Sequence, residues 1–285
     1  MSQAVYGARS RRGWVAMAVL AGMPETLHAE WTKLRTLAST FWLLAGAVAL
    51  TVAVSAAVAS AATCSQGSCA PAQTGVDPAK LSLAGVQVGQ AVVAIIAVLA
   101  ISDEYSTGMI RVTLTAMPRR LAVLAAKAAL VGGLVLTAAT VAVLASVLAG
   151  RLLLPGHGFT PANGYQVLSL GNGGDLRAAA GTVLYLALVA QLALGVATAV
   201  RDSAVAIGTV LGLLYLFPIV AAVVGNQHWQ RHLEQAAPMT AGLYIQVTED
   251  VGRLPLTPWQ GLGVTALWAA GALILGATVL RLRDA

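Results

Sequence analysis

Charge is the scarcest property of this sequence: 10% of its 285 residues are Asp, Glu, Lys or Arg, whereas about a quarter are charged in a typical soluble domain. Aromatic residues are also few, at 5%, while 58% of the residues are hydrophobic. Together with a mean hydropathy of +0.79, this excludes a water-soluble globule. The net charge of +6 comes from only 17 basic residues, so a lipid bilayer is a more natural partner than nucleic acid.

The sequence also lacks the groups that most enzymes need. Its three lysines are Lys33, Lys80 and Lys127, and none follows a glycine directly, as a phosphate-binding loop requires. The apolar runs contain no paired carboxylates, histidine cluster or nucleophile beside a base. We therefore expect no enzyme activity, no cofactor and no metal on this chain, and any ATP hydrolysis that powers it would occur on another chain.

Cysteine and histidine are rare as well. Cys64 and Cys69 fall in one predicted external loop. Two alternatives stay open: a disulfide between them closes this loop, or the two cysteines are not bonded to each other. His228 and His232 would share one face of a helix. That spacing can chelate a metal with a third ligand such as Glu234, but an exposed polar helix face explains it as well, and we favour that interpretation.

The sequence does contain several long apolar runs. Each spans about 20 residues or more, enough to cross about 30 Å of hydrocarbon as a helix, and none shows the alternation of a barrel strand. The predicted fold is an all-α integral membrane protein with six spans in a single domain, residues 37–285. The spans are residues 37–62, 81–102, 123–150, 178–200, 204–225 and 260–280.

The charged residues predict the orientation of these six spans. An even number of spans places both termini on one side, and that side carries 12 basic and 6 acidic residues, whereas the other carries 5 of each. By the positive-inside rule, both termini are cytoplasmic. Lys127 lies close to the cytoplasmic Arg119 and Arg120, so we expect its stem to reach water at the membrane surface.

Residues 1–36 are predicted to be a cytoplasmic leader followed by an interfacial helix. The apolar run at residues 13–23 is too short to span and has no clean signal-peptide cleavage site. Leu27, Trp31 and Leu34 then recur at helical spacing. This pattern indicates an amphipathic helix in the membrane interface that leads into the first span.

Polar and small residues inside the spans suggest helix packing. Gln87, Gln90 and Gln191 are the main polar side chains at depth, and interhelical hydrogen bonding is a commoner use for them than contact with a substrate. Two small-xxx-small pairs, Gly208 with Gly212 and Gly195 with Ala199, permit close helix packing within the chain or between subunits. The external segment 226–259 is predicted to form a short helix pair at the outer membrane face.

Residues 102–120, between the second and third spans, form the most informative cytoplasmic stretch. Ser102 is suited to cap a helix whose first turn carries Asp103 and Glu104. Ile110, Leu114 and Met117 form an apolar stripe, and a proline stops the run. We therefore predict a short amphipathic helix at the cytoplasmic face.

At these residues the sequence resembles the permease subunits of type-2 ATP-binding-cassette (ABC) exporters, especially the actinobacterial kind. The resemblance covers essentially the whole chain and rests on four segments: residues 29–42, residues 103–111 with 118–120, residues 256–261 and residues 281–285. It implies a permease of the bacterial cytoplasmic membrane that pairs with a second permease, as a homo- or heterodimer, and with two ATPase subunits that bind ATP and Mg²⁺. It also implies which residues contact the ATPase: Asp103, Glu104, Tyr105, Gly108, Arg111, Pro118 and Arg119 in the loop, and Glu30, Trp31, Lys33 and Arg35 in the interfacial helix.

Two other classes of function stay open at this point. The chain would be a non-transporting membrane anchor or regulatory subunit if no cassette ATPase accompanies it. A secondary carrier would show charged or broken helices in repeated halves, and we find no convincing internal repeat. Export is the favoured interpretation and is what the resemblance implies. A pathway lined by Ala, Val, Leu and Gly suits an amphipathic, lipid-like or drug-like substrate better than a small ion.

Overall fold

The computed structural model describes residues 38–63, 76–106, 120–223 and 226–282 of the chain. In these ranges the regular structure is entirely helical, and no strand occurs. Five helices are long and apolar enough to cross a membrane: Phe41–Ala61 within α3 (Ala38–Ala61), Leu121–His157 covering most of α8 (Arg120–Leu153), α9 (Gly173–Val200), α10 (Ser203–Val223) and α13 (Pro258–Leu282). They correspond to five of the six predicted spans, and the prediction of an all-helical fold is confirmed for the described residues.

The second predicted span begins later than expected. Residues 78–82 form a separate short helix, α5 (Pro78–Ser82), and α6 (Val86–Ser106) starts only after a turn. Gly85 makes this turn against α3, because a Cβ there would lie 2.0 Å from the backbone oxygen of Thr51. Its N–H donates to Ser55 Oγ at 3.1 Å. The apolar part of α6 is therefore 17 residues long, Val86–Ser102.

The C-terminal end of α6 corrects another prediction. Ser102 does not cap a new helix, since it lies buried within α6, which continues to Ser106. No glycine or proline interrupts the chain between Gln90 and Ser106, so the hydrogen-bond ladder runs on. The apolar stripe of the amphipathic helix predicted within residues 102–120, formed by Ile110, Leu114 and Met117, lies outside the described residues, as do the leader and the interfacial helix.

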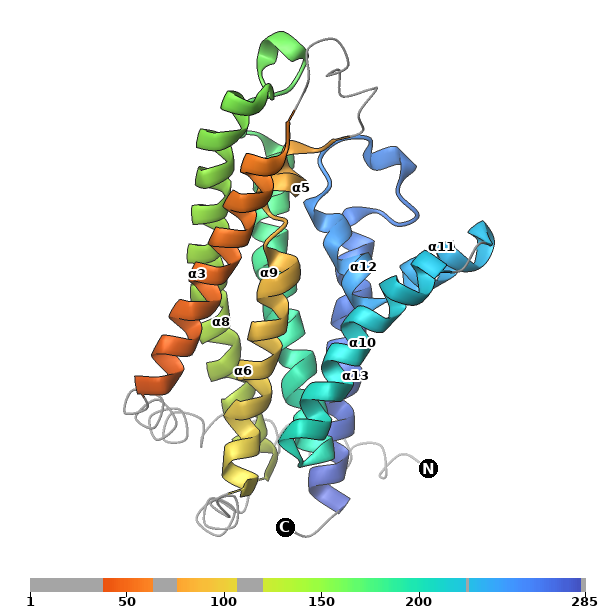
Figure 1. Ribbon diagram of the computed structural model, residues 1–285. Coiled ribbons are helices and arrows are strands. Elements are labelled where there is room, and N and C mark those ends of the chain that lie inside the picture. Colours follow the sequence, from red (N-terminus) through yellow and green to blue (C-terminus); the bar gives the residue numbers. More distant parts are fainter. Residues whose placement is uncertain (1–37, 64–75, 107–119, 224–225, 283–285) are drawn as a thin grey trace, which may run out of the picture.

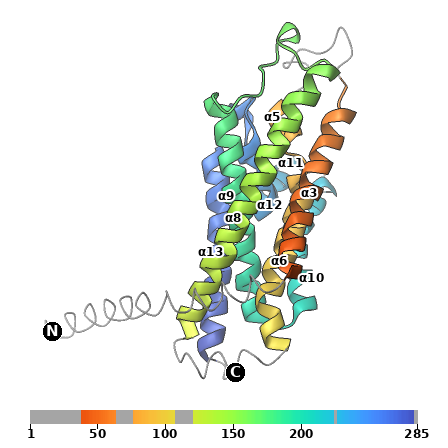
Figure 2. The same ribbon diagram turned by 90° about the vertical axis from the view of Figure 1, so that its left-hand side faces the viewer.

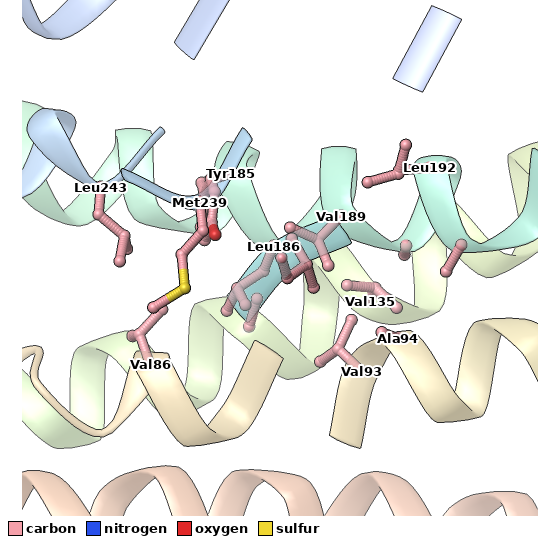
Figure 3. Packing of buried hydrophobic residues seen from close by; sticks show 14 of the residues in the cluster. Val86, Val93, Ala94, Val135, Tyr185, Leu186, Val189, Leu192, Met239 and Leu243 are labelled. Atoms are coloured by element: carbon pink, nitrogen blue, oxygen red, sulfur yellow. The ribbon is translucent and has the colours of Figure 1, made fainter. Parts of the chain in front are cut away.

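Helix α9 is the centre of the bundle. Of its most apolar window 56% is buried, compared with 17–33% for the other four candidate spans. Its closest partner is α13, where Gly195 and Gly276 bring the two backbones together: a Cβ on Gly195 would lie 2.5 Å from backbone atoms of Ala272 and Leu273. The predicted small-residue packing at Gly195 is thus confirmed within the chain. Figure 3 shows α9 side chains pointing toward α6 and α8, in the core.

The two ends of the bundle are built differently. At one end, at the bottom of Figures 1 and 2, lie the last turn of α6, the first turn of α8, the turn between α9 and α10, and the end of α13. At the other end lie α5 and the short helices η1 (Leu154–His157), η2 (Pro161–Asn163), η3 (Tyr244–Gln246) and η4 (Val251–Arg253). The described residues that are predicted to be cytoplasmic, such as Lys127, Arg201 and Arg281, therefore lie at the end with the shorter described connections.

The segment after α10 forms the predicted helix pair, α11 (Gln227–Ala236) and α12 (Pro238–Leu243). Asn226 caps α11 by accepting from the N–H of His228 at 2.9 Å, and Pro238 starts α12. Helix α11 projects sideways from the bundle (Figure 1). Its polar sequence contrasts with the apolar spans, so it adds a charged and aromatic arm to the side of the molecule.

Candidate functional site: the coupling end and an apolar groove

The structure places only part of the predicted ATPase-contact segment. Asp103, Glu104 and Tyr105 form the last turn of α6, although their side chains are not among those described. The remaining residues predicted to act as a docking or disulfide site lie outside the described residues; they are Gly108, Arg111, Pro118, Arg119, Glu30, Trp31, Lys33, Arg35, Cys64 and Cys69. Their roles stay predictions.

The residues just before the turn that carries Asp103 and Glu104 are packed against the rest of the bundle. Ile101 and Ser102 are buried against the bundle. Lys127 of α8 donates from Nζ to the backbone oxygen of Ala100 at 3.4 Å, and only 5% of it is exposed. The expectation that its stem reaches water is therefore wrong. Its ammonium instead lies near the negative end of the α6 dipole, which favours a positive charge.

The turn between α9 and α10 is equally tight. Arg201 ends α9 in the left-handed conformation, with φ 65°, which costs a non-glycine residue free energy. The carboxylate of Asp202 accepts from the N–H of Val205 at 2.8 Å and so caps α10. This two-residue connection ties the movement of α10 at this end to α9.

Two tyrosines join α6 to the centre of the bundle. Tyr185 of α9 donates from its hydroxyl to the Oε1 atom of Gln90 in α6, and both side chains are fully buried. Tyr215 of α10 donates to the backbone oxygen of Gln87. Helix α6 is thus hydrogen-bonded near its beginning to both α9 and α10, about 20 Å along the helix from Asp103.

The glutamines at depth serve helix contacts in two of three cases. Gln90 accepts from Tyr185, and Gln191 of α9 donates from Nε2 to the backbone oxygen of Ala128 in α8 at 2.8 Å. The side chain of Gln87 is exposed. The prediction of interhelical hydrogen bonding is therefore confirmed for Gln90 and Gln191.

A large apolar groove of about 950 Å³ opens between α9, α10 and α13. Gly208 and Gly212 of α10 and Gly271 of α13 lie along it, and a Cβ on any of them would meet no atom within 4 Å. The predicted small-residue pair Gly208 and Gly212 therefore packs against nothing within the described part of the chain. Its other lining residues are Leu192, Val196, Thr209, Leu213, Leu216, Phe217, Gln235, Ala236, Val264, Leu267, Trp268, Ala272 and Leu275.

At the end of the bundle opposite to the turn with Asp103 and Glu104, Asp77 joins two distant segments. It caps α5 by accepting from the N–H groups of Ala79 and Lys80, at 2.9 and 3.2 Å. The same carboxylate accepts from the N–H and the hydroxyl of Thr248, at 2.5 and 2.8 Å, and from the N–H of Glu249 at 3.1 Å. One buried carboxylate thus fixes the segment before α6 to the segment before α13.

Sequence reasoning missed both tyrosines and Asp77. Tyr185 and Tyr215 each place a hydroxyl inside an apolar run, and such a group needs a partner when it is removed from water. Asp77 directly precedes Pro78, a pair typical of a helix start. These signals indicate where a contact is needed, but not which residue supplies it.

A comparison with protein families decides which kind of membrane bundle this is. The model of the ABC-2 family transporter protein matches residues 26–227, which is more than half of the chain and reaches from before α3 to the start of α11. The chain belongs to the ABC-2 transporter family. A search among curated proteins finds no match.

Family membership fixes the coarse role of this ABC-2 protein. It is a multi-pass membrane protein and the permease component of an ABC transporter, and it works with an ABC ATPase subunit. In this ABC-2 permease the matched range contains the turn with Asp103 and Glu104 and two of the three groove-forming helices, α9 and α10. The helix α13, which completes the groove, lies beyond the match.

Proposed function

We propose that this permease exports an amphipathic, lipid-like or drug-like substrate across the bacterial cytoplasmic membrane. The observation that carries this proposal is the groove of about 950 Å³ between α9, α10 and α13, whose lining is almost entirely apolar. Apolar side chains such as these bind hydrocarbon rather than ions, because an ion would lose its hydration without gaining a charged or polar partner. Thr209 and Gln235 are the polar side chains of the lining.

In this proposal α6 also crosses the membrane as the second of six spans, and both termini are cytoplasmic. The apolar part of α6, Val86–Ser102, is 17 residues long, about 26 Å at 1.5 Å per residue, which is the short end of the length that crosses a bilayer. The positive-inside rule then directs the end with Arg281, Lys127 and Arg201 to the cytoplasm. The end with Asp77 and α11 faces outward.

The energy comes from two ATPase subunits that bind ATP and Mg²⁺, while this chain pairs with a second permease, identical or related. ATPase closure pushes the turn at Asp103 and Glu104 and the segment that follows it. Because Lys127 and the two tyrosine contacts hold α6 to α8, α9 and α10, a displacement of α6 moves the wall of the groove. Such a transmission needs an element with two arrangements, and the bundle of α6, α9 and α10 is that element.

A non-transporting anchor or regulatory subunit remains the second candidate, and a secondary carrier the third. A membrane anchor does not need an open groove, so a substitution that fills the groove would leave its function unchanged. A carrier would transport without ATP.

Filling the groove tests the proposal. Gly212→Phe places a ring in the groove, whereas Gly133→Phe places the same ring on the outer surface of α8, where a Cβ also meets nothing within 4 Å. The permease is reconstituted with its ATPase in liposomes, and substrate-stimulated ATP hydrolysis and transport of fluorescent lipids and amphipathic dyes are measured. We expect Gly212→Phe to lose both and Gly133→Phe to keep both. Equal activity of the two variants would refute the assignment of the groove.

A further inference from the structure

Two imidazole rings lie together on the exposed surface of α11. His228 and His232 are one helical turn apart, and both side chains are exposed. Their Nε2 atoms are 3.2 Å apart, and the ring centroids are 4.5 Å apart with the planes at 87°. The helix backbone fixes this spacing, since residues i and i+4 are neighbours on one face.

The distance between the two nitrogens suits a shared metal ion. An ion about 2.05 Å from each nitrogen, the usual zinc–imidazole distance, would form an N–metal–N angle of about 100°, between the square-planar and tetrahedral values. The 3.2 Å contact is a hydrogen bond in which one Nε2 carries the proton and the other accepts it. A metal ion would replace that proton: with both rings in the tautomer that is protonated on Nδ1, rotation of the two exposed side chains directs both Nε2 lone pairs at the ion. Neutral imidazole is a good ligand for Zn²⁺, Cu²⁺ and Ni²⁺.

The neighbouring carboxylate does not belong to this pair. Glu234 accepts from Gln230 Nε2 at 2.9 Å and from the Tyr244 hydroxyl at 3.4 Å. Within the described part of the chain, no group of three or more His, Cys, Asp or Glu residues is arranged to hold a metal. The site therefore has two protein ligands, and water or a group from another molecule completes the coordination.

We propose that His228 and His232 bind a divalent transition-metal ion, Cu²⁺ most tightly and Zn²⁺ or Ni²⁺ more weakly, in the order set by the Irving–Williams series. The ion links two successive turns of α11 and so resists unwinding of this helix. Gln235 and Ala236, at the end of the same helix, line the apolar groove. Metal binding therefore stiffens one wall of the groove.

Binding is tested on the full-length purified protein in detergent, without ATPase or substrate, so that the outcome is independent of the transport proposal. Cys64 and Cys69 are replaced by serine in every sample, because thiolates also bind these metals. Cu²⁺ is titrated by calorimetry, and the one-equivalent sample is examined by electron paramagnetic resonance for nitrogen coupling. Matched controls are His28→Ala and His157→Ala, which remove the other two histidines of the chain.

We expect His228→Ala and His232→Ala each to weaken Cu²⁺ binding at least tenfold, since loss of even an outer-shell partner of a metal ligand costs about 10–100-fold. The two control variants should change the affinity less than about twofold. Zn²⁺ should slow hydrogen exchange in residues 228–236 in the parent and not in His232→Ala. Unchanged binding in His228→Ala, or an equal loss in His157→Ala, would overturn the proposal.

Discussion

The buried contact between Tyr185 and Gln90 allows a quantitative test of how α6 is held. Tyr185→Phe removes the hydroxyl that donates to Gln90 Oε1, and both residues have 0% exposure. The oxygen of Gln90 is then left buried without its donor, which costs about 1–3 kcal/mol in a protein interior. Hydrogen bonds between membrane helices contribute less, about 0.6 kcal/mol on average and up to about 1.7 kcal/mol. We therefore expect Tyr185→Phe to lower the free energy of unfolding by about 1 kcal/mol.

A double-mutant cycle separates the contact from the loss of the groups themselves. Gln90→Leu removes the partner, and Tyr185→Phe combined with Gln90→Leu removes both, so the double variant should be less destabilised than the sum of the single variants. The assay is reversible unfolding in mixed micelles, followed by circular dichroism, with all four proteins at one detergent composition. Additive effects of the two substitutions would refute the view that this pair fastens α6 to α9.

Two further predictions concern packing and pH. Gly195→Ala should destabilise the protein by about 1–3 kcal/mol through overpacking, because the new Cβ would lie 2.5 Å from the α13 backbone. Gly271→Ala, which faces the open groove, should not destabilise the protein. Thermal unfolding of both variants tests this difference. Burial, with Glu234 beside it, raises the pKa of Tyr244 from 10.0 to about 12. Because the folded state holds this proton more tightly than the unfolded state, stability should fall as the pH rises from about 10 to about 12, and Tyr244→Phe should reduce that slope in unfolding measured against pH.

The sequence predicted most of the fold because hydrophobic length is a direct physical requirement of a bilayer. Five spans were located to within a few residues at most of their ends. The start of α6 was misplaced since the residues before it are also apolar, and hydropathy does not register the turn that Gly85 makes against Thr51. The N-cap predicted at Ser102 failed because burial of Ile101 and Ser102 against the bundle keeps the α6 helix going.

The site was predicted less completely, because its contacts join residues far apart in the chain. Gly195 and Gly212 belong to the same kind of small-residue pattern, yet one packs against α13 and the other faces an open groove. Only the position of the neighbouring helix distinguishes them. Tyr185 and Gln90 are likewise 95 residues apart in sequence, so no local pattern could pair them.

In the mechanism that we propose, the last turn of α6 and the segment that follows it couple this permease to its ATPase. The most direct measurement compares ATP hydrolysis and transport in the reconstituted complex for Glu104→Ala and Gly108→Val, with Glu249→Ala at the opposite end of the bundle as the control. We expect the first two variants to assemble and fold but to lose substrate-stimulated hydrolysis and transport, while the control keeps both. Unchanged coupling in correctly folded Glu104→Ala and Gly108→Val complexes would contradict it.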